Sequence, residues 1–160
     1  MTIAPCQLRP ESRGTIHIKS SDPSQYPAIV ANYLADPLDQ EVAIAGLKWA
    51  RKIGEQPAIA KYVEQEMNPG PGFESDEMLL EYAKASGSTL YHPVGTCAMG
   101  SGPMAVVDAQ LRVRGVDGLR VVDASIMPRL VSGNTNAPTI MIGEKGAAMI
   151  LQAAKTPVAA

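Results

Sequence analysis

The sequence has few cysteines and almost no imbalance of charge, and both shortages exclude classes of protein. Cys6 and Cys97 are its two cysteines and form no CxxC pair, so a disulfide-rich scaffold is excluded. The 14 basic and 16 acidic side chains give a net charge of −2 without a basic tract. We therefore expect no binding to nucleic acid through phosphate neutralisation.

Long apolar runs are also missing. No run approaches the roughly 18 apolar residues that a membrane span needs, and the first residues lack the pattern of a signal peptide. We interpret the two thiols as buried or half-buried groups in a reducing compartment. These features predict a cytoplasmic protein. With 160 residues and 46% hydrophobic side chains, the chain is long enough to bury a core, which argues against wholesale disorder.

What is present predicts an α+β fold. We expect an antiparallel sheet that includes a strand over 15–19 and strands near Thr89 and Cys97, backed by helices over 36–53 and 75–86. Asp36 and Pro37 are a typical N-cap and first helical residue. The remaining expectations are an irregular segment over 20–36, a short helix over 57–66, short strands over 106–113 and 119–122, and a buried helix over 138–154. Small residues in that last helix permit close approach to a sheet or a ligand: Gly143, Gly146, Ala147 and Ala148.

His92 is the first candidate for chemistry. It lies in the charge-poor segment Tyr91-His92-Pro93-Val94-Gly95-Thr96-Cys97-Ala98-Met99-Gly100. The following proline restricts His92 to extended backbone, and a histidine held stiffly can transfer protons near neutral pH. A purely structural histidine remains the alternative here, and for His17 it is the preferred interpretation. A zinc site with Cys97 lacks further ligands at usable spacing, so no metal site is predicted.

A polar turn before the last helix is the second candidate. Residues 131–139 read Val-Ser-Gly-Asn-Thr-Asn-Ala-Pro-Thr, and the free N–H groups of a helix N-terminus suit an anionic or carbonyl-rich ligand. Helix capping by Asn136 explains one of the two asparagines but not both. Asp123 ends a hydrophobic segment, where ligand binding and local capping are both open.

Four segments in this order resemble the C-terminal part of the glucose–methanol–choline (GMC) oxidoreductases, in particular the choline dehydrogenase-like alcohol dehydrogenases. The resemblance covers nearly the whole chain. The segments are Leu8-Arg9-Pro10-Glu11-Ser12-Arg13-Gly14, the His92 segment, Leu119-Arg120-Val121-Val122-Asp123-Ala124-Ser125, and Asn134-Thr135-Asn136-Ala137-Pro138-Thr139.

This resemblance implies an enzyme that oxidises a small alcohol by hydride transfer to FAD. His92 corresponds to the catalytic base, and Asn134 to the residue that hydrogen-bonds the substrate oxygen. The resemblance also assigns flavin contacts to Tyr91, Asp123, Ala124, Asn134, Thr135, Asn136 and Pro138. The choice of alcohol stays open, because Trp49 and Phe73 do not identify an aromatic cage for choline.

The family's dinucleotide fingerprint GxGxxG is missing from the sequence. We therefore expect the chain to correspond to the final third of a longer enzyme and to be inactive without an N-terminal FAD-binding portion. The expected parts are a substrate-binding domain over 1–114, a segment over 115–155 that returns to the FAD domain, and a tail over 156–160. The alternative is a non-catalytic truncated or split module. Such a module would form homo-oligomers through exposed apolar surface, with 119–122 as a candidate, or would complement an FAD-domain partner.

Overall fold

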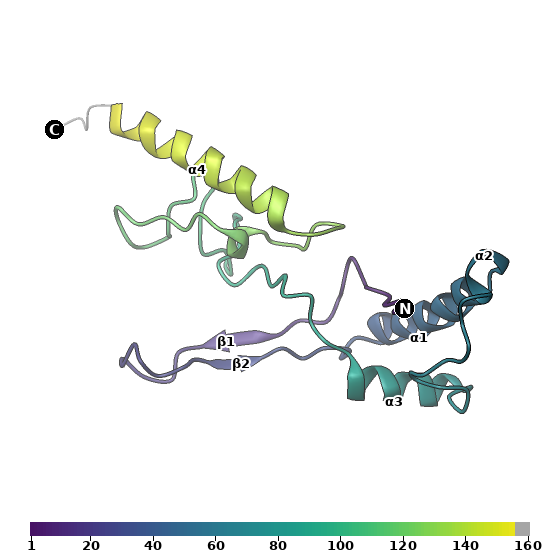
Figure 1. Cartoon of the computed structure of the whole chain (residues 1–160). Helices are drawn as coiled ribbons and strands as arrows, with labels where there is room; N and C mark the ends of the chain where they lie inside the picture. The colour runs from purple at the N-terminus through teal and green to yellow at the C-terminus, as the bar shows by residue number, and fades with distance from the viewer. Residues whose placement is uncertain (156–160) are drawn as a thin grey trace. The chain divides into compact units, whose positions relative to one another are not determined.

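The computed structural model describes residues 1–155, which divide into two compact units, 1–89 and 90–155 (Figure 1). The expected α+β class is confirmed. The elements are β1 (Thr15–His17), β2 (Ala28–Val30), α1 (Pro37–Gly54), α2 (Pro57–Ala60), α3 (Asp76–Ser86), the 3₁₀ turn η1 (Ala124–Ile126) and α4 (Asn136–Lys155).

In the first unit, α1 begins directly after its predicted cap Asp36, and α3 begins directly after Ser75, the first residue of the helix predicted over 75–86. The Asp36 carboxylate accepts a hydrogen bond from the Leu38 N–H at 2.9 Å, and the Ser75 hydroxyl accepts one from the Met78 N–H at 3.3 Å. The two helices pack against each other, and Leu79 of α3 is fully buried. Helix pairing therefore supplies the apolar packing of this unit.

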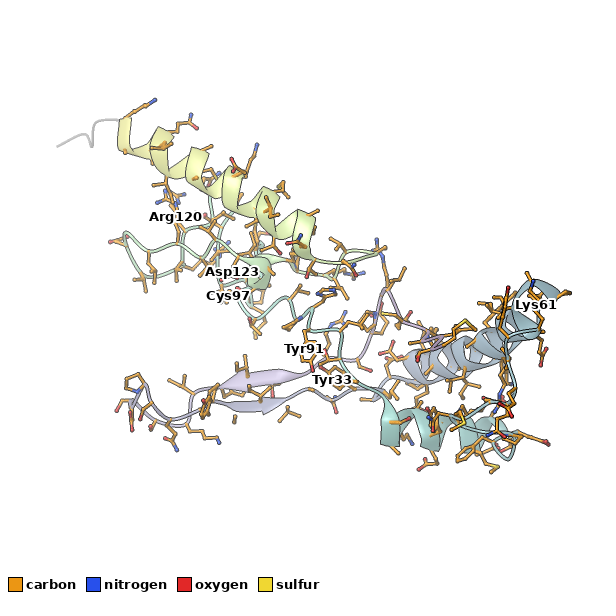
Figure 2. All side chains as sticks on the ribbon, viewed as in Figure 1. Tyr33, Lys61, Tyr91, Cys97, Arg120 and Asp123 are labelled. Carbon is orange, nitrogen blue, oxygen red and sulfur yellow. The ribbon has the colours of Figure 1, made fainter. Side chains whose placement is uncertain are left out.

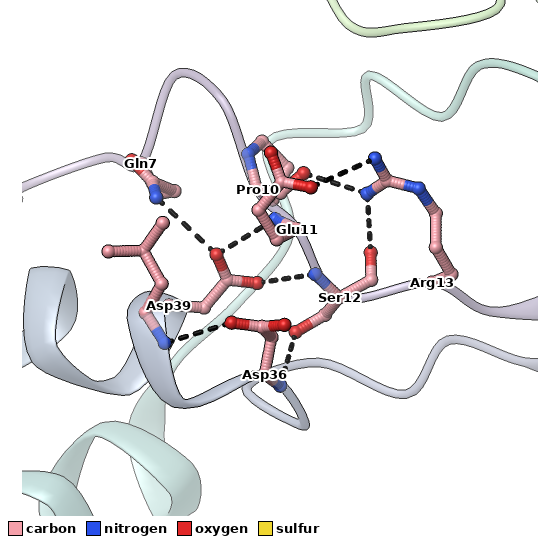
Figure 3. A network of polar contacts seen from close by, with 8 residues as sticks. Gln7, Pro10, Glu11, Ser12, Arg13, Asp36 and Asp39 are labelled. Atoms are coloured by element: carbon pink, nitrogen blue, oxygen red, sulfur yellow. Dashed lines mark hydrogen bonds and ion pairs between the residues drawn. The ribbon is translucent and has the colours of Figure 1, made fainter.

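Asp39, on the first turn of α1, fastens the extended N-terminal segment to the helix (Figure 3). Its carboxylate accepts hydrogen bonds from the backbone N–H groups of Glu11 (2.9 Å) and Ser12 (2.8 Å) and from the Gln7 amide (3.4 Å). Burial alone raises the pKa of Asp39, but the hydrogen bonds from Ser12, Glu11 and Gln7 outweigh it, and the net pKa is lowered. The N-terminal segment is thus attached to α1 by hydrogen bonds to a buried carboxylate.

The sheet is smaller than expected. The strands β1 and β2 pair antiparallel, with Ile16 opposite Ile29, so the prediction of an irregular 20–36 was wrong at Ala28–Val30. No strand forms near Thr89 or Cys97. The N–H groups of Cys97 and Met99 instead donate to carbonyls of residues 125 and 126. Nor do the helices back this sheet, since α1 packs on α2 and α3.

The short helix predicted over 57–66 ends at Ala60. The guanidinium of Arg51 in α1 holds the loop that follows this helix. It pairs with the Glu66 carboxylate at 3.0 Å and donates to the carbonyls of Gly70 (3.1 Å) and Phe73 (2.7 Å). These carbonyls can reach one side chain only if the loop that carries them curves around it.

The second unit has a hydrophobic core although its backbone is mostly irregular. The buried core residues are Val107, Leu111, Ile126, Met127 and Ile142. The strands predicted over 106–113 and 119–122 are present only as isolated bridges, such as Val107 with Val113 and Arg112 with Arg120. Left-handed residues interrupt both stretches: Leu111 (φ +64°) lies between Val107 and Val113, and Gly115 (φ +77°) and Gly118 (φ +73°) lie between Arg112 and Arg120.

Helix α4 covers the segment at 119–127, and a glycine permits this contact. A β-carbon at Gly146 would overlap the Cγ1 atom of Val122, so the Val122 side chain packs against the helix where a side chain is missing. The predicted close approach of a small-residue helix is confirmed at Gly146. At Gly143 nothing lies within 4 Å of the same added atom.

The boundary between the structural units, after Thr89, differs from the predicted division at 114/115. The predicted division concerns domains of a longer enzyme and stays a prediction. The predicted tail, 156–160, lies outside the described residues. Among residues 1–155, no helix combines the length and apolar composition needed to cross a membrane.

Candidate active site

The segment that carries His92 is fixed by backbone hydrogen bonds to the η1 region. The Cys97 N–H donates to the Ser125 carbonyl at 3.0 Å, and the Met99 N–H donates to the Ile126 carbonyl at 2.8 Å. Gly95 has a φ of +86° and faces the Met127 carbonyl, so it provides a left-handed turn between His92 and this anchor. His92 therefore lies on a loop that is anchored just beyond it.

Both ring nitrogens of His92 have a partner in the turn before α4. Its Nε2 lies 3.3 Å from Oδ1 of Asn134, and its Nδ1 lies 2.9 Å from Oγ1 of Thr135. The residues involved are 42 and 43 positions apart in the sequence. The structure thus joins two predicted site segments through the imidazole ring.

The two sides of the ring differ in exposure. Thr135 is only 8% exposed, whereas Asn134 is exposed and His92 is half-buried. Nδ1 is therefore bonded to a buried residue, while the partner of Nε2 is accessible. Of the two ring nitrogens, Nε2 therefore has the more accessible surroundings.

Thr135, rather than Asn136, precedes the last helix. Helix α4 begins at Asn136, and the Thr135 carbonyl accepts the first helical bond, from the Thr139 N–H at 3.0 Å. The interpretation of Asn136 as the capping residue was therefore wrong, because the helix starts one residue earlier than that role requires. The prediction that Pro138 lies in the first turn is confirmed.

Asp123 caps a local turn. Its Oδ1 accepts hydrogen bonds from the Ser125 N–H at 2.8 Å and the Ser125 hydroxyl at 2.5 Å. Figure 2 labels Asp123 and Cys97 on neighbouring segments, which agrees with the backbone bond between Cys97 and Ser125. The capping alternative accounts for this geometry, and flavin contacts by Asp123 and Ala124 remain predictions.

The other residues predicted to contact flavin are Tyr91, Asn136 and Pro138, which lie near His92 or Thr135 in the sequence. Tyr91 is 80% exposed and has a φ of +59°, which directs the chain sharply into His92. Asn136 and Pro138 occupy the first turn of α4, directly after Thr135. Their assignment to the cofactor stays a prediction.

The chemistry available at this cluster is that of one titratable ring between two neutral partners. The imidazole can accept a proton, and the asparagine amide can donate to an oxygen. Within residues 1–155, no group of three or more histidine, cysteine or carboxylate side chains could hold a metal ion. The geometry therefore fits proton transfer to or from an accessible polar atom.

The contact between Thr135 and His92 was not foreseen from the sequence. Thr135 was singled out only through the resemblance, as a flavin neighbour. The signal was weak, because a threonine that directly precedes a helix is common as a cap. Only the fold brings residues 92 and 135 together.

The comparison with known proteins identifies the family of this chain. The sequence pattern described as "GMC oxidoreductase" matches residues 10–143, and the chain belongs to this family. Members of the family depend on FAD. The predicted family membership is therefore confirmed.

Individual relatives agree with this assignment. The chain is 50% identical over 151 residues to an alcohol dehydrogenase [acceptor] of Pseudomonas putida, which covers 94% of the chain and 27% of that protein. It is 50% identical over 143 residues to an oxygen-dependent choline dehydrogenase of Escherichia coli, covering 89% and 25%. The crystal structure of pyridoxine 4-oxidase from Mesorbium loti superposes with a TM-score of 0.85 at 36% identity, covering 91% and 28%. The chain thus spans about a quarter of the length of the curated relatives it matches.

Proposed function

We propose that this chain supplies the catalytic histidine and part of the substrate wall of an FAD-dependent alcohol oxidoreductase. The observation that carries the proposal is the pairing of His92 with Asn134, at 3.3 Å, before the N-terminus of α4. In this reaction a CH–OH donor loses a hydride from carbon and a proton from oxygen and becomes a carbonyl compound. FAD, when bound, supplies the hydride acceptor.

His92 takes the hydroxyl proton at Nε2, the nitrogen with the accessible partner. Asn134 cannot titrate, so its contribution is a hydrogen bond to the substrate oxygen as negative charge develops there. This division of labour needs the imidazole and the amide close together on an anchored backbone. The backbone bonds from Cys97 and Met99 provide that anchor.

The residues at this end of α4 are suitable neighbours for a flavin ring. A helix of 20 residues presents unpaired N–H groups and the positive end of its dipole at Asn136. Such a helix end would stabilise negative charge on a bound flavin. We propose that Thr135, Asn136 and Pro138 lie against the ring, with Tyr91, Asp123 and Ala124 nearby.

The substrate class that we propose is a small alcohol. The relatives carry names that refer to alcohol, choline and pyridoxine, and the CH–OH group is common to these compounds. A choline cage built on Trp49 is not favoured, since the Lys52 ammonium lies 5.0 Å from the centre of that ring. A cation already beside the ring would repel a quaternary ammonium group.

The two histidines of the sequence allow a matched test. We expect His92→Ala to lower alcohol oxidation by about 10²–10⁴-fold, which is the usual contribution of a positioned general base. The assay uses a completed flavoenzyme, in which this chain replaces the matching segment of the Pseudomonas putida relative. The control is His17→Ala, because His17 is exposed on β1 in the other unit.

The absorbance of bound flavin should be unchanged in both variants. Turnover by His92→Ala within a few-fold of the parent enzyme would contradict the proposed role. Loss of flavin from His92→Ala would indicate a binding role instead.

A second candidate is a non-catalytic module that associates through apolar surface. Large apolar side chains on α4 are exposed: Ile140 at 60%, Met141 at 56%, Ile150 at 44% and Leu151 at 64%. This face is a better candidate than 119–122, where Val122 packs against Gly146. Light scattering over a dilution series tests the idea, and a monomer at every concentration would exclude self-association.

A further inference from the structure

A polar cleft lies in the second unit, between the turn over 110–120 and the C-terminal half of α4. Its volume is about 310 Å³, and Figure 2 labels Arg120 beside this part of the helix. The lining consists of two arginines and a glutamine of the turn with three residues of α4: Gln110, Arg112, Arg120, Met149, Gln152 and Ala153. Both charged side chains of the lining are therefore positive.

The backbone places these two arginines side by side. Arg112 and Arg120 form an isolated antiparallel bridge, and Gly115 and Gly118, with φ values of +77° and +73°, turn the chain between them. Residues directly opposite each other in such a bridge have their side chains on the same face, where two like charges repel. An anion in the cleft would offset this repulsion.

Arg112 has a carboxylate partner among residues 1–155, whereas Arg120 has none. The Asp108 carboxylate accepts a hydrogen bond from Nε of Arg112 at 2.8 Å. Arg120 is half-buried, and its Nε donates to the Gln110 carbonyl at 3.3 Å. A half-buried guanidinium has lost part of its hydration, and its planar N–H groups fit a carboxylate well. The cleft therefore presents one positive charge that lacks a counter-charge.

We propose that this cleft receives a carboxylate side chain from the N-terminal portion that completes the enzyme, and that Arg120 is its main partner. The chain spans about a quarter of the length of its curated relatives, so most of a complete protein is available to supply that carboxylate. The proposal does not depend on the catalytic role of His92.

The surroundings of the cleft favour a protein partner over a free anion. Ile150 and Leu151 directly precede the last α4 residues of the lining, and they are 44% and 64% exposed. Met149 adds a half-buried apolar side chain to the lining itself. Arginine is enriched among the residues that dominate protein interfaces, where neighbouring contacts exclude water from the charge. A carboxylate on a segment packed against this apolar surface would be desolvated together with Arg120.

A zero-length carbodiimide cross-link tests the proposal directly, because it joins an amine to a carboxylate that is in contact with it. The sample is the completed flavoenzyme, in which this chain replaces the matching segment of the Pseudomonas putida relative, carrying Arg120→Lys. Peptide mass spectrometry identifies the joined residues. We expect the substituted lysine to be joined to an aspartate or glutamate of the N-terminal portion.

The matched control is Arg129→Lys, which places a lysine at an exposed position of the same unit outside the lining of the cleft. We expect no such product from this variant. A cross-link from Arg120→Lys to Asp108 or to another carboxylate of this chain would overturn the proposal, and so would the absence of any cross-link.

Stability distinguishes the proposed pairing from a role of Arg120 within the chain. We expect Arg120→Gln to speed thermal inactivation of the completed enzyme by about 10–100-fold, because the partner carboxylate would stay desolvated without a counter-charge. In the isolated 160-residue chain the urea midpoint should stay unchanged or rise, since the repulsion from Arg112 is removed. Arg129→Gln should alter neither measurement.

An equal loss of stability in the isolated chain and in the completed enzyme would contradict the proposal, since Arg120 would then act within the chain. A free anion is the other source of negative charge. If sodium phosphate stabilised the completed enzyme more than sodium chloride at equal ionic strength, and did not do so in Arg120→Gln, the cleft would be open to free anions and the proposal would fail. If the completed enzyme with Arg120→Gln does not fold, the cross-link from Arg120→Lys decides the question.

Discussion

Each of the two units is stabilised internally, and by different kinds of contact. Residues 1–89 contain most of the regular elements, yet one large apolar side chain, Leu79, is fully buried there, and a carboxylate and a guanidinium fasten the loops. Residues 90–155 have little regular structure before α4, but they contain the cluster of buried apolar residues. The candidate active site belongs to the second unit, where an apolar core supports irregular loops. A histidine on such a loop can be held stiffly without belonging to a helix or a strand.

The largest expected effect concerns the core of the second unit. We expect Gly146→Val to destabilise residues 90–155 by about 3 kcal/mol or more, because the new side chain would overlap Val122 and overpacked cores relax poorly. Hydrogen exchange followed by mass spectrometry measures each unit separately. The control Gly143→Ala has open space around the added atom and should stabilise α4 by about 0.5–1 kcal/mol.

If Gly146→Val also increased exchange throughout residues 1–89, the two units would unfold together. The two units would then differ in their internal packing but not in their stability.

The next effect concerns the polar anchor of the first unit. We expect Asp39→Asn to destabilise residues 1–89 by about 2 kcal/mol, because an amide cannot accept from Glu11, Ser12 and Gln7 as the carboxylate does. Trp49 of α1 reports this unit by fluorescence during urea unfolding. The exposed neighbour Glu41→Gln is the control and should change the unfolding midpoint little. Equal unfolding midpoints for the two variants would show that Asp39 does not stabilise residues 1–89.

Acid should weaken the first unit through the same group. The pKa of folded Asp39 is lowered, so its stabilising contribution is fully present above the unfolded value of about 3.9 and is lost as the pH falls through the folded value. Hydrogen bonds from Arg112 also lower the pKa of Asp108 in the second unit, but that side chain is partly exposed, and screening by solvent limits its effect. The urea midpoint of the first unit, followed by Trp49 fluorescence, should therefore fall as the pH is lowered from 5 to 3. Unchanged pH dependence in Asp39→Asn would assign the effect to other groups.

The smallest effect concerns a helix cap. We expect Ser75→Ala to destabilise α3 by about 1 kcal/mol, because the Met78 N–H loses its acceptor. Exchange of the amides in the first turn of α3 measures this loss. Ser75→Thr keeps a capping oxygen and serves as the control. Identical exchange in Ser75→Ala and the parent chain would mean that water replaces the cap at no cost.

Sequence reasoning was accurate where the governing interactions are local. Asp36 with Pro37 and Ser75 mark the starts of α1 and α3, since a cap involves residues only two or three positions apart. It was inaccurate where partners are distant. The expected strands at 106–113 and 119–122 became isolated bridges, and residues 28–30 formed a strand inside a segment that was expected to be irregular.

For the candidate site, the sequence was informative about residue types and less so about contacts. His92 followed by Pro93 indicated a constrained imidazole, and two asparagines before an apolar helix indicated more than a cap. Neither pattern contains the distance between residues 92 and 135. Asp123 illustrates the opposite case, because its bonds to Ser125 lie within two residues and the capping alternative was already visible.

The sequence by itself determined the family, the α+β class, the starts of α1 and α3 and the residue types able to do chemistry. These properties depend on short motifs, on capping and on hydrophobic periodicity, all of which are local. Only the tertiary structure decided that Thr135 meets Nδ1 of His92 while Asn134 meets Nε2. That pairing depends on α4 packing through Gly146 against Val122, and on the His92 loop bonding to residues 125 and 126. Contacts across more than 40 residues arise from packing of the whole unit, which no local pattern encodes.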